Sequence, residues 1–189
     1  CYDLMKPPPF PVAGDCLCRE FQMAAGEAST RLDDAPRQER AALRYFEDLE
    51  DGEHLPALSV TLGEDDIVAF GAAYDPQPFH VDPDAAKESI FGGLVASGLH
   101  TLAACTRLVV DGQKGLVVVS GLGLDSVSFS SPVRAGDRLT IDAWWSDLKR
   151  SASKPERGFA RLNCRIRNQD GVIVADYAYR YLIASRPIT

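Results

Sequence analysis

Long apolar runs are missing from this chain of 189 residues. The most apolar stretch, residues 116–119 and their flanks, is interrupted by Ser120, Gly121 and Gly123, whereas a membrane helix needs roughly 18 apolar residues. No basic start precedes an apolar segment, so neither a membrane span nor a secretory signal peptide is expected. With 46% hydrophobic and 25% charged residues, the chain has the composition of a soluble globular protein.

Basic residues are also in short supply. The chain has 20 Lys and Arg against 27 Asp and Glu, a net charge of −7. Because contacts with nucleic-acid phosphates need a basic face, no nucleic-acid partner is expected. A local basic patch could still bind an anionic cofactor.

Cysteine and histidine are few and show no metal-binding spacing. The five cysteines are an odd number, and the pair Cys16 and Cys18 has no second pair nearby, so neither a disulfide framework nor a zinc site is predicted. Free thiols indicate a reducing cytoplasmic location. The histidines His54, His80 and His100 lie far apart, so no metal site is expected.

Two parts of the chain differ in composition. Residues 1–42 begin with four prolines among the first 11 residues and are predicted to be a leader or arm, partly extended or disordered. Near its end, Asp34 and Pro36 have the pattern of a helix start, which predicts a short helix over residues 36–49. A single compact domain is predicted over residues 43–189.

Within that domain, helical patterns come first and strand patterns follow. The helices are predicted over residues 64–74, 83–89 and 99–110, the last apolar on most sides and therefore buried. Strands are predicted over residues 58–62, 116–119, 124–129, 138–145, 158–167 and 172–184. This order predicts an α+β fold in which a helix covers one face of an antiparallel sheet.

Asp75 and His80 stand out as a pair that could move protons. Pro76 and Pro78 predict a rigid loop between them, which would hold the two side chains in a fixed relation. A carboxylate and an imidazole together cover the range needed for proton transfer near neutral pH. Capping and turn formation are the other common uses of these residue types.

A glycine-rich stretch precedes the longest predicted helix. Its sequence runs from Gly92 and Gly93 to Ser97 and Gly98. Free backbone N–H groups at a helix start favour a developing negative oxygen. A tight turn that only packs is the alternative.

Together the two stretches resemble the hydratase motif of the MaoC-like dehydratase family, D-x-N-P-x-H followed by a glycine at the start of a long central helix. Asp75, Pro78, His80 and Gly98 match this pattern. A later stretch, residues 132–139, resembles the family's P-V-x-x-G-D-x-L turn. The resemblance extends over about residues 45–184. Two positions depart from it: Gln77 stands where many members have Asn, and Ser97 where the family often has His.

The resemblance implies a hot-dog fold, in which a curved antiparallel sheet wraps a long central helix, and a homodimer or higher homo-oligomer. It also implies interconversion of trans-2-enoyl-CoA and (R)-3-hydroxyacyl-CoA, with an acyl-CoA substrate and no cofactor. Asp75 and His80 would share one water molecule as acid and base. The Gly98 N–H would bind the thioester oxygen.

Further residues follow from the same comparison. Gln77, Gly93 and Ser97 are expected to contact the substrate. Thr106 falls where some members place a hydroxyl that supports the Asp, and a core threonine is the equal alternative. His100 is expected to pack within the fold.

A basic loop over residues 149–157 could meet the phosphates of CoA, although solvated charge is the commoner use of such a loop. Two other functions remain open: a non-catalytic hot-dog subunit that binds acyl chains, and a thioesterase. Fold alone does not choose among the three functions. The Asp75 and His80 pair favours hydration.

Overall fold

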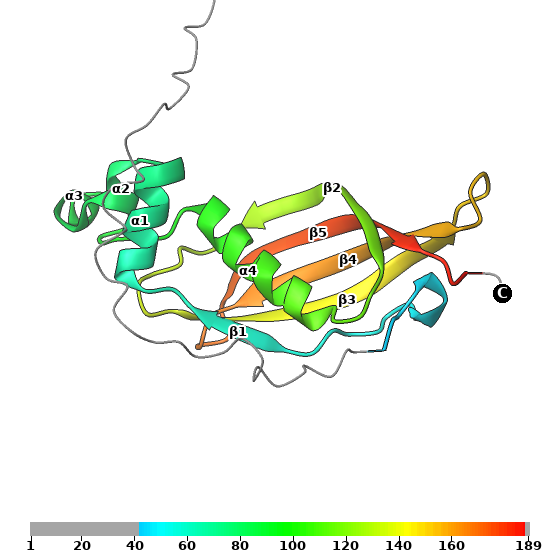
Figure 1. The fold of residues 1–189 in the computed structure, drawn as a ribbon. Coiled ribbons are helices and arrows are strands. Elements are labelled where there is room, and N and C mark those ends of the chain that lie inside the picture. The colour runs from blue at the N-terminus through cyan, green and yellow to red at the C-terminus, as the bar shows by residue number, and fades with distance from the viewer. Residues whose placement is uncertain (1–41, 188–189) are drawn as a thin grey trace, which may run out of the picture. The chain divides into compact units, whose positions relative to one another are not determined.

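One antiparallel sheet wraps around one long helix in the computed structural model, which describes residues 42–187. The sheet has five strands in the order β1-β3-β4-β5-β2, and helix α4 (Gly98–Gly112) lies along its inner face (Figure 1). The strands are β1 (Leu58–Thr61), β2 (Val118–Phe129), β3 (Arg138–Arg150), β4 (Arg157–Arg167) and β5 (Ile173–Ala184). The predicted α+β fold, a central helix wrapped by an antiparallel sheet, is confirmed.

The core lies between α4 and the inner face of the sheet. Buried and less buried residues alternate along β4, as the period of two requires. The strand side chains that are at most 2% exposed on this face include Leu139, Ile141, Trp145, Leu162, Cys164 and Ile166. Helix α4 contributes Cys105 and Val109, both 0% exposed. Since burying one large apolar side chain stabilises a fold by roughly 1.5–3 kcal/mol, this face accounts for much of the stability.

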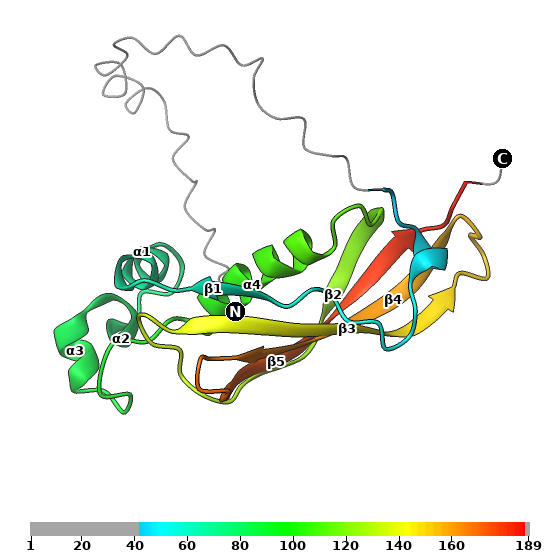
Figure 2. The same ribbon diagram turned by 90° about the horizontal axis from the view of Figure 1, so that it is seen from below.

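Three shorter helices gather at one end of the sheet (Figures 1 and 2). They are α1 (Glu64–Tyr74), α2 (Pro78–Val81) and α3 (Pro83–Lys87). Asp82 caps α3, where its carboxylate accepts hydrogen bonds from the backbone N–H groups of Asp84 and Ala85. Two of these helices, α2 and α3, begin with proline. Proline fits the first helical position because an N–H group there would have no acceptor within the helix, so its absence costs nothing.

Several predicted boundaries differ from the structure. Of the helix predicted over residues 36–49, the described part holds only a 3₁₀ turn, η1 (Phe46–Asp48). The Phe46 ring packs against Gly158 of β4, so closely that a Cβ there would overlap the ring. The predicted leader, residues 1–42, lies almost wholly outside the described residues.

The two strands predicted over residues 116–119 and 124–129 are one strand, β2. Gly121 and Gly123 accompany shifts in its register against β5, so they bend the strand rather than end it. Strand β3 runs on to Arg150, into the predicted basic loop. Helix α4 is less buried than predicted, because Leu99 is 56% and Val110 58% exposed.

The described cysteines agree with the expectation of free thiols: Cys105 and Cys164 are buried and unpaired. The other three cysteines lie outside the described residues. Among the helices of residues 42–187, none has the length and apolar character needed to span a bilayer.

Candidate active site

Asp75 and His80 are held by two short helices that pack closely. Asp75 ends α1, where its N–H bonds the Gly71 carbonyl at 2.9 Å, and Pro76 prevents the helix from continuing. His80 lies in α2, which begins at Pro78, so the predicted loop is partly helical. A Cβ at Gly71 would lie 2.9 Å from the His80 carbonyl oxygen. Only glycine therefore allows α1 and α2 to approach this closely.

The two side chains face each other. His80 Nε2 lies 3.4 Å from Asp75 Oδ2, and the His80 side chain is almost fully buried. His80 Nδ1 lies 2.7 Å from the Val95 carbonyl oxygen. Because a carbonyl can only accept, Nδ1 carries a proton, so in the neutral form of the ring Nε2 has a free lone pair.

Two donors hold the Asp75 carboxylate. Ser97 Oγ donates to Oδ2 at 2.6 Å, and Gln77 Nε2 donates to Oδ1 at 3.0 Å. These bonds, the Ser97 bond first, lower the pKa of Asp75 below its ordinary value, while burial opposes them and the nearby His80 adds a lesser lowering. Asp75 is therefore ionised near neutral pH.

When Asp75 is ionised and His80 is in its neutral form, the two side chains present two acceptors to the same space. Two acceptors do not bond each other, but one water molecule can donate a hydrogen to each. Such a water keeps its lone pairs free to attack an electrophile. The pair is arranged to activate water.

Ser97 has a second contact that explains where α4 begins. Its Oγ accepts a hydrogen bond of 3.2 Å from the Leu99 N–H, which makes Ser97 the N-cap of the helix. One hydroxyl therefore joins the start of α4 to the Asp75 carboxylate. A serine directly before a predicted helix is the sequence pattern that predicts the cap. No pattern in the sequence predicts the hydrogen bond from Ser97 to Asp75.

Gly98 is the first residue of α4. Within residues 42–187 its N–H has no hydrogen-bond acceptor, as is usual in a first helical turn. A Cβ at this position would lie 2.7 Å from carbons of the Phe129 ring, so the ring covers the glycine backbone closely. The free N–H and the helix dipole together suit an oxygen that gains negative charge.

A cavity of about 510 Å³ opens at these groups. The polar side chains of its lining are those of Asp75, Gln77, His80, Ser97, Thr101, Ser130 and Ser131, and the Gly98 backbone lies among them. Its apolar lining includes Phe79, Phe91, Leu99, Phe129, Val133 and Val174. A few convergent polar groups in a mostly apolar cavity are typical of a small-molecule site. The sequence did not single out Phe129, since a phenylalanine at a strand end carries no site pattern.

Two predicted site residues lie elsewhere. Thr106 Oγ1 donates to the Leu102 carbonyl at 2.7 Å and contacts the Tyr179 hydroxyl, so it is a core threonine and does not support Asp75. Gly93 is outside the cavity lining and packs against the side chain of Arg134, with 3.4 Å between Nη1 and the position of a Cβ.

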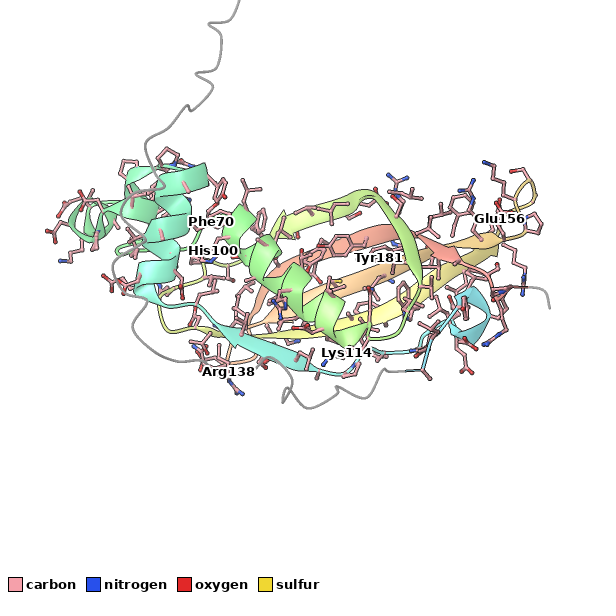
Figure 3. All side chains as sticks on the ribbon, in the orientation of Figure 1. Phe70, His100, Lys114, Arg138, Glu156 and Tyr181 are labelled. Carbon is pink, nitrogen blue, oxygen red and sulfur yellow. The ribbon has the colours of Figure 1, made fainter. Side chains whose placement is uncertain are left out.

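His100 packs as predicted, between α1 and α4. Its ring stacks on Phe70 with 4.6 Å between centroids and 5° between planes (Figure 3). The basic loop, marked by Glu156 in Figure 3, lies at the opposite end of the sheet from Phe70 and His100. It is therefore far from Asp75 and His80, and Arg150 there pairs with Glu47 at 2.9 Å.

No three His, Cys, Asp or Glu side chains gather in a metal-binding arrangement within residues 42–187.

Several known proteins are similar to this chain in sequence and fold. A family model described as "MaoC like domain" matches residues 48–162. The (R)-specific enoyl-CoA hydratase of Rhodospirillum rubrum is 34% identical over 132 residues, which are 66% of this chain and 83% of that protein. The crystal structure of the MaoC-like dehydratase from Rhodospirillum rubrum superposes with a TM-score of 0.70 at 34% identity, covering 77% of this chain and 99% of that one.

Some relatives are matched over a smaller share of their length. The aligned segment spans 63% of the uncharacterized protein YdeM of Bacillus subtilis and 29% of Protein MaoC of Klebsiella aerogenes, each at 34% identity. The family match covers more than half of the chain described here, and the superposition confirms the predicted hot-dog fold. The chain therefore belongs to the MaoC-like dehydratase family.

Proposed function

We propose that this protein interconverts trans-2-enoyl-CoA and (R)-3-hydroxyacyl-CoA, with Asp75 and His80 as the acid-base pair. The observation that carries the proposal is the geometry of this pair, with Asp75 Oδ2 and His80 Nε2 3.4 Å apart in the lining of the cavity. The relative from Rhodospirillum rubrum is named for the same reaction.

In the hydration direction, the water oxygen forms a bond to the β-carbon of the enoyl group. His80 Nε2 takes one proton from that water as the bond forms, and the electron pair of the double bond moves toward the thioester carbonyl. The resulting imidazolium gives the proton to the α-carbon, which balances the reaction. Asp75 accepts a hydrogen bond from the other O–H of the water, whose hydrogen stays on the oxygen as the product hydroxyl, and the Asp75 charge stabilises the imidazolium.

The Gly98 N–H would donate to the thioester oxygen while enolate charge develops. A donor of this kind acts mainly in the transition state, when the oxygen is most negative. Phe129, which packs on Gly98, would keep bulk water from that oxygen.

Loss of enoyl-thioester absorbance tests the proposal. Crotonyl-CoA and a longer enoyl-CoA are the substrates, and release of free thiol from a saturated acyl-CoA is measured alongside. Hydration predicts loss of absorbance and no thiol. Thiol release without hydration would indicate a thioesterase, and tight acyl-CoA binding with neither reaction would indicate a binding subunit.

We also propose that the protein forms a homodimer through β2. Within the described residues this strand has a neighbour on one side only, and six of its apolar side chains are exposed. They are Val118, Val119, Leu122, Leu124, Val127 and Phe129. A long apolar edge strand is prone to pair with another strand. A second copy can pair with the free backbone groups of this edge, because two copies of one strand can pair antiparallel across a two-fold axis.

A further inference from the structure

Arg134 makes an unusual contact beside the cavity. Its Nη2 donates a hydrogen bond of 2.6 Å to the Phe91 carbonyl, and within residues 42–187 its guanidinium forms no ion pair. The residue belongs to the 132–137 turn, whereas Phe91 opens the segment that leads to α4. The side chain thus joins two segments that both line the cavity.

The 132–137 turn is a firm base for this contact. The Asp137 carboxylate accepts bonds from the Arg134 N–H at 2.8 Å and from Gln169 Nε2 at 2.9 Å. The Gly136 N–H bonds the Leu62 carbonyl at 2.8 Å. These contacts anchor the turn to the β4–β5 hairpin and to the chain that follows β1.

The partner segment carries the carbonyl that orients His80. Val95 pairs with Arg134 as an isolated antiparallel bridge, and the Ala96 N–H bonds the Val133 carbonyl at 2.8 Å. The Val95 carbonyl accepts a hydrogen bond from the His80 Nδ1–H group. The direction of that carbonyl therefore depends on how the segment is held against the turn.

Aromatic contacts also connect Phe91 to His80. The Phe91 ring packs edge-on against Phe79 with centroids 5.1 Å apart. Phe79 in turn packs edge-on against the His80 ring at 4.6 Å. Fixing the Phe91 backbone thus limits the movement of the two groups that contact His80, the Val95 carbonyl and the Phe79 ring.

We propose that Arg134 is a positioning residue that fixes the segment from Phe91 to Val95 and thereby the Nδ1–H tautomer and the orientation of His80. Gly93 fits this role, because it leaves space for the guanidinium where a side chain would approach it. The catalytic consequence rests on the function proposed above, whereas the effect on His80 does not.

The decisive measurement is the ¹⁵N spectrum of the histidine side chains in the ligand-free protein, assigned with a His80→Gln variant. The parent should show His80 as one tautomer with the proton on Nδ1. In Arg134→Met, the segment that carries the Val95 carbonyl loses its side-chain anchor at Phe91 and keeps only its backbone bonds, so the His80 signals should move toward the average of two tautomers. Arg134→Lys, which keeps one donor, should show a smaller change.

Arg167→Met is the matched control. Arg167 also donates from its guanidinium to a backbone carbonyl, that of Gly171, at 3.0 Å, but it lies in the β4–β5 hairpin. Its removal should leave the His80 signals unchanged. If the Arg134→Met signals match those of the control, the proposal is overturned.

Turnover gives the second readout. Because misplacing a catalytic group by about 1 Å can cost roughly a hundredfold in rate, Arg134→Met should lower kcat about tenfold or more with little change in KM. Arg167→Met should turn over like the parent. If the parent itself hydrates no enoyl-CoA, the proposed function fails, and the ¹⁵N spectra still decide the role of Arg134.

Discussion

Ser97 Oγ donates to Asp75 Oδ2 at 2.6 Å while it accepts from the N–H of Leu99, so one hydroxyl both caps α4 and holds the carboxylate. This relation ties the proton-transfer pair to the helix whose first N–H is free. The Asp75 carboxylate cannot move without disturbing the start of α4. The carboxylate is thus oriented in the ligand-free structure by the same residue that starts the helix.

Replacing Ser97 by Ala should raise the pKa of Asp75 toward its ordinary value of 3.8, because the Ser97 bond is the largest cause of its lowering. Since folding lowers this pKa, the ionised group contributes stability above pH 3.8 that is lost as the pH falls through the folded pKa. A ¹³C titration of the Asp75 carboxyl checks the change. Gln77→Ala, which removes the weaker bond, should shift the pKa less, and an unmoved pKa in Ser97→Ala would refute the assignment.

Gly71→Ala should separate α1 from α2, because the new Cβ would lie 2.9 Å from the His80 carbonyl oxygen. We expect a loss of about 1–3 kcal/mol of unfolding free energy, with lower activity. Gly112→Ala is the matched control in α4, since its nearest contact is an ordinary 3.6 Å. There alanine should stabilise the helix by roughly 0.5–1 kcal/mol. Equal unfolding midpoints for the two variants would count against the close packing of α1 on α2.

His100 should make the fold sensitive to mild acid. Among residues 42–187 its buried Nδ1 finds no hydrogen-bond partner, and burial lowers the pKa of His100 below 6.5, against a smaller opposing effect of Asp66. A pKa lowered by folding means that the protein loses stability as the pH falls below 6.5, until the folded pKa is passed.

His100→Phe keeps the stacking on Phe70 without a titrating group, and His100→Gln removes both. Denaturant unfolding from pH 7 to 5 should show the parent losing stability relative to each variant. If the unfolding free energy of the parent and of both variants changed with pH in the same way, His100 would protonate equally well in the folded and unfolded chain.

Leu122→Lys should weaken the proposed dimer. Leu122 is 43% exposed on β2, and a charge there would be buried between two copies. Ile90→Lys, at a position 96% exposed near α3, is the control and should leave the assembly unchanged. Sedimentation of the three proteins measures the result. A monomeric parent at micromolar concentration would end the proposal.

The sequence predicted what local patterns determine. Pro76 and Pro78 marked the rigid connection between Asp75 and His80, and the glycines before α4 marked the helix start at Gly98. Period-two alternation identified β3 and β4 because one face of each is buried, whereas β5 buries residues on both faces. The glycines of β2 misled the prediction, since a bulge and a strand end look alike in sequence.

Contacts between distant segments were not predictable. Ser97 meets Asp75 across 22 residues, and Phe129 reaches Gly98 only after β2 has folded against β5. The sequence left open whether Thr106 points to the site or to the core. The rotation of α4 about its axis places it in the core, against the Tyr179 hydroxyl. Arg134 lay in a recognised turn, but its partner Phe91 is 43 residues away. Such pairings depend on register and helix rotation, which single-sequence patterns do not specify.

The Asp75→Asn variant tests the central claim most directly. Asparagine keeps the size of the side chain but removes the negative charge that holds water and imidazolium. With crotonyl-CoA and any longer enoyl-CoA that the parent hydrates, loss of enoyl absorbance should fall by several orders of magnitude while the circular dichroism spectrum stays that of the parent. Turnover within about tenfold of the parent, a difference of only about 1.4 kcal/mol in the barrier, would contradict the account.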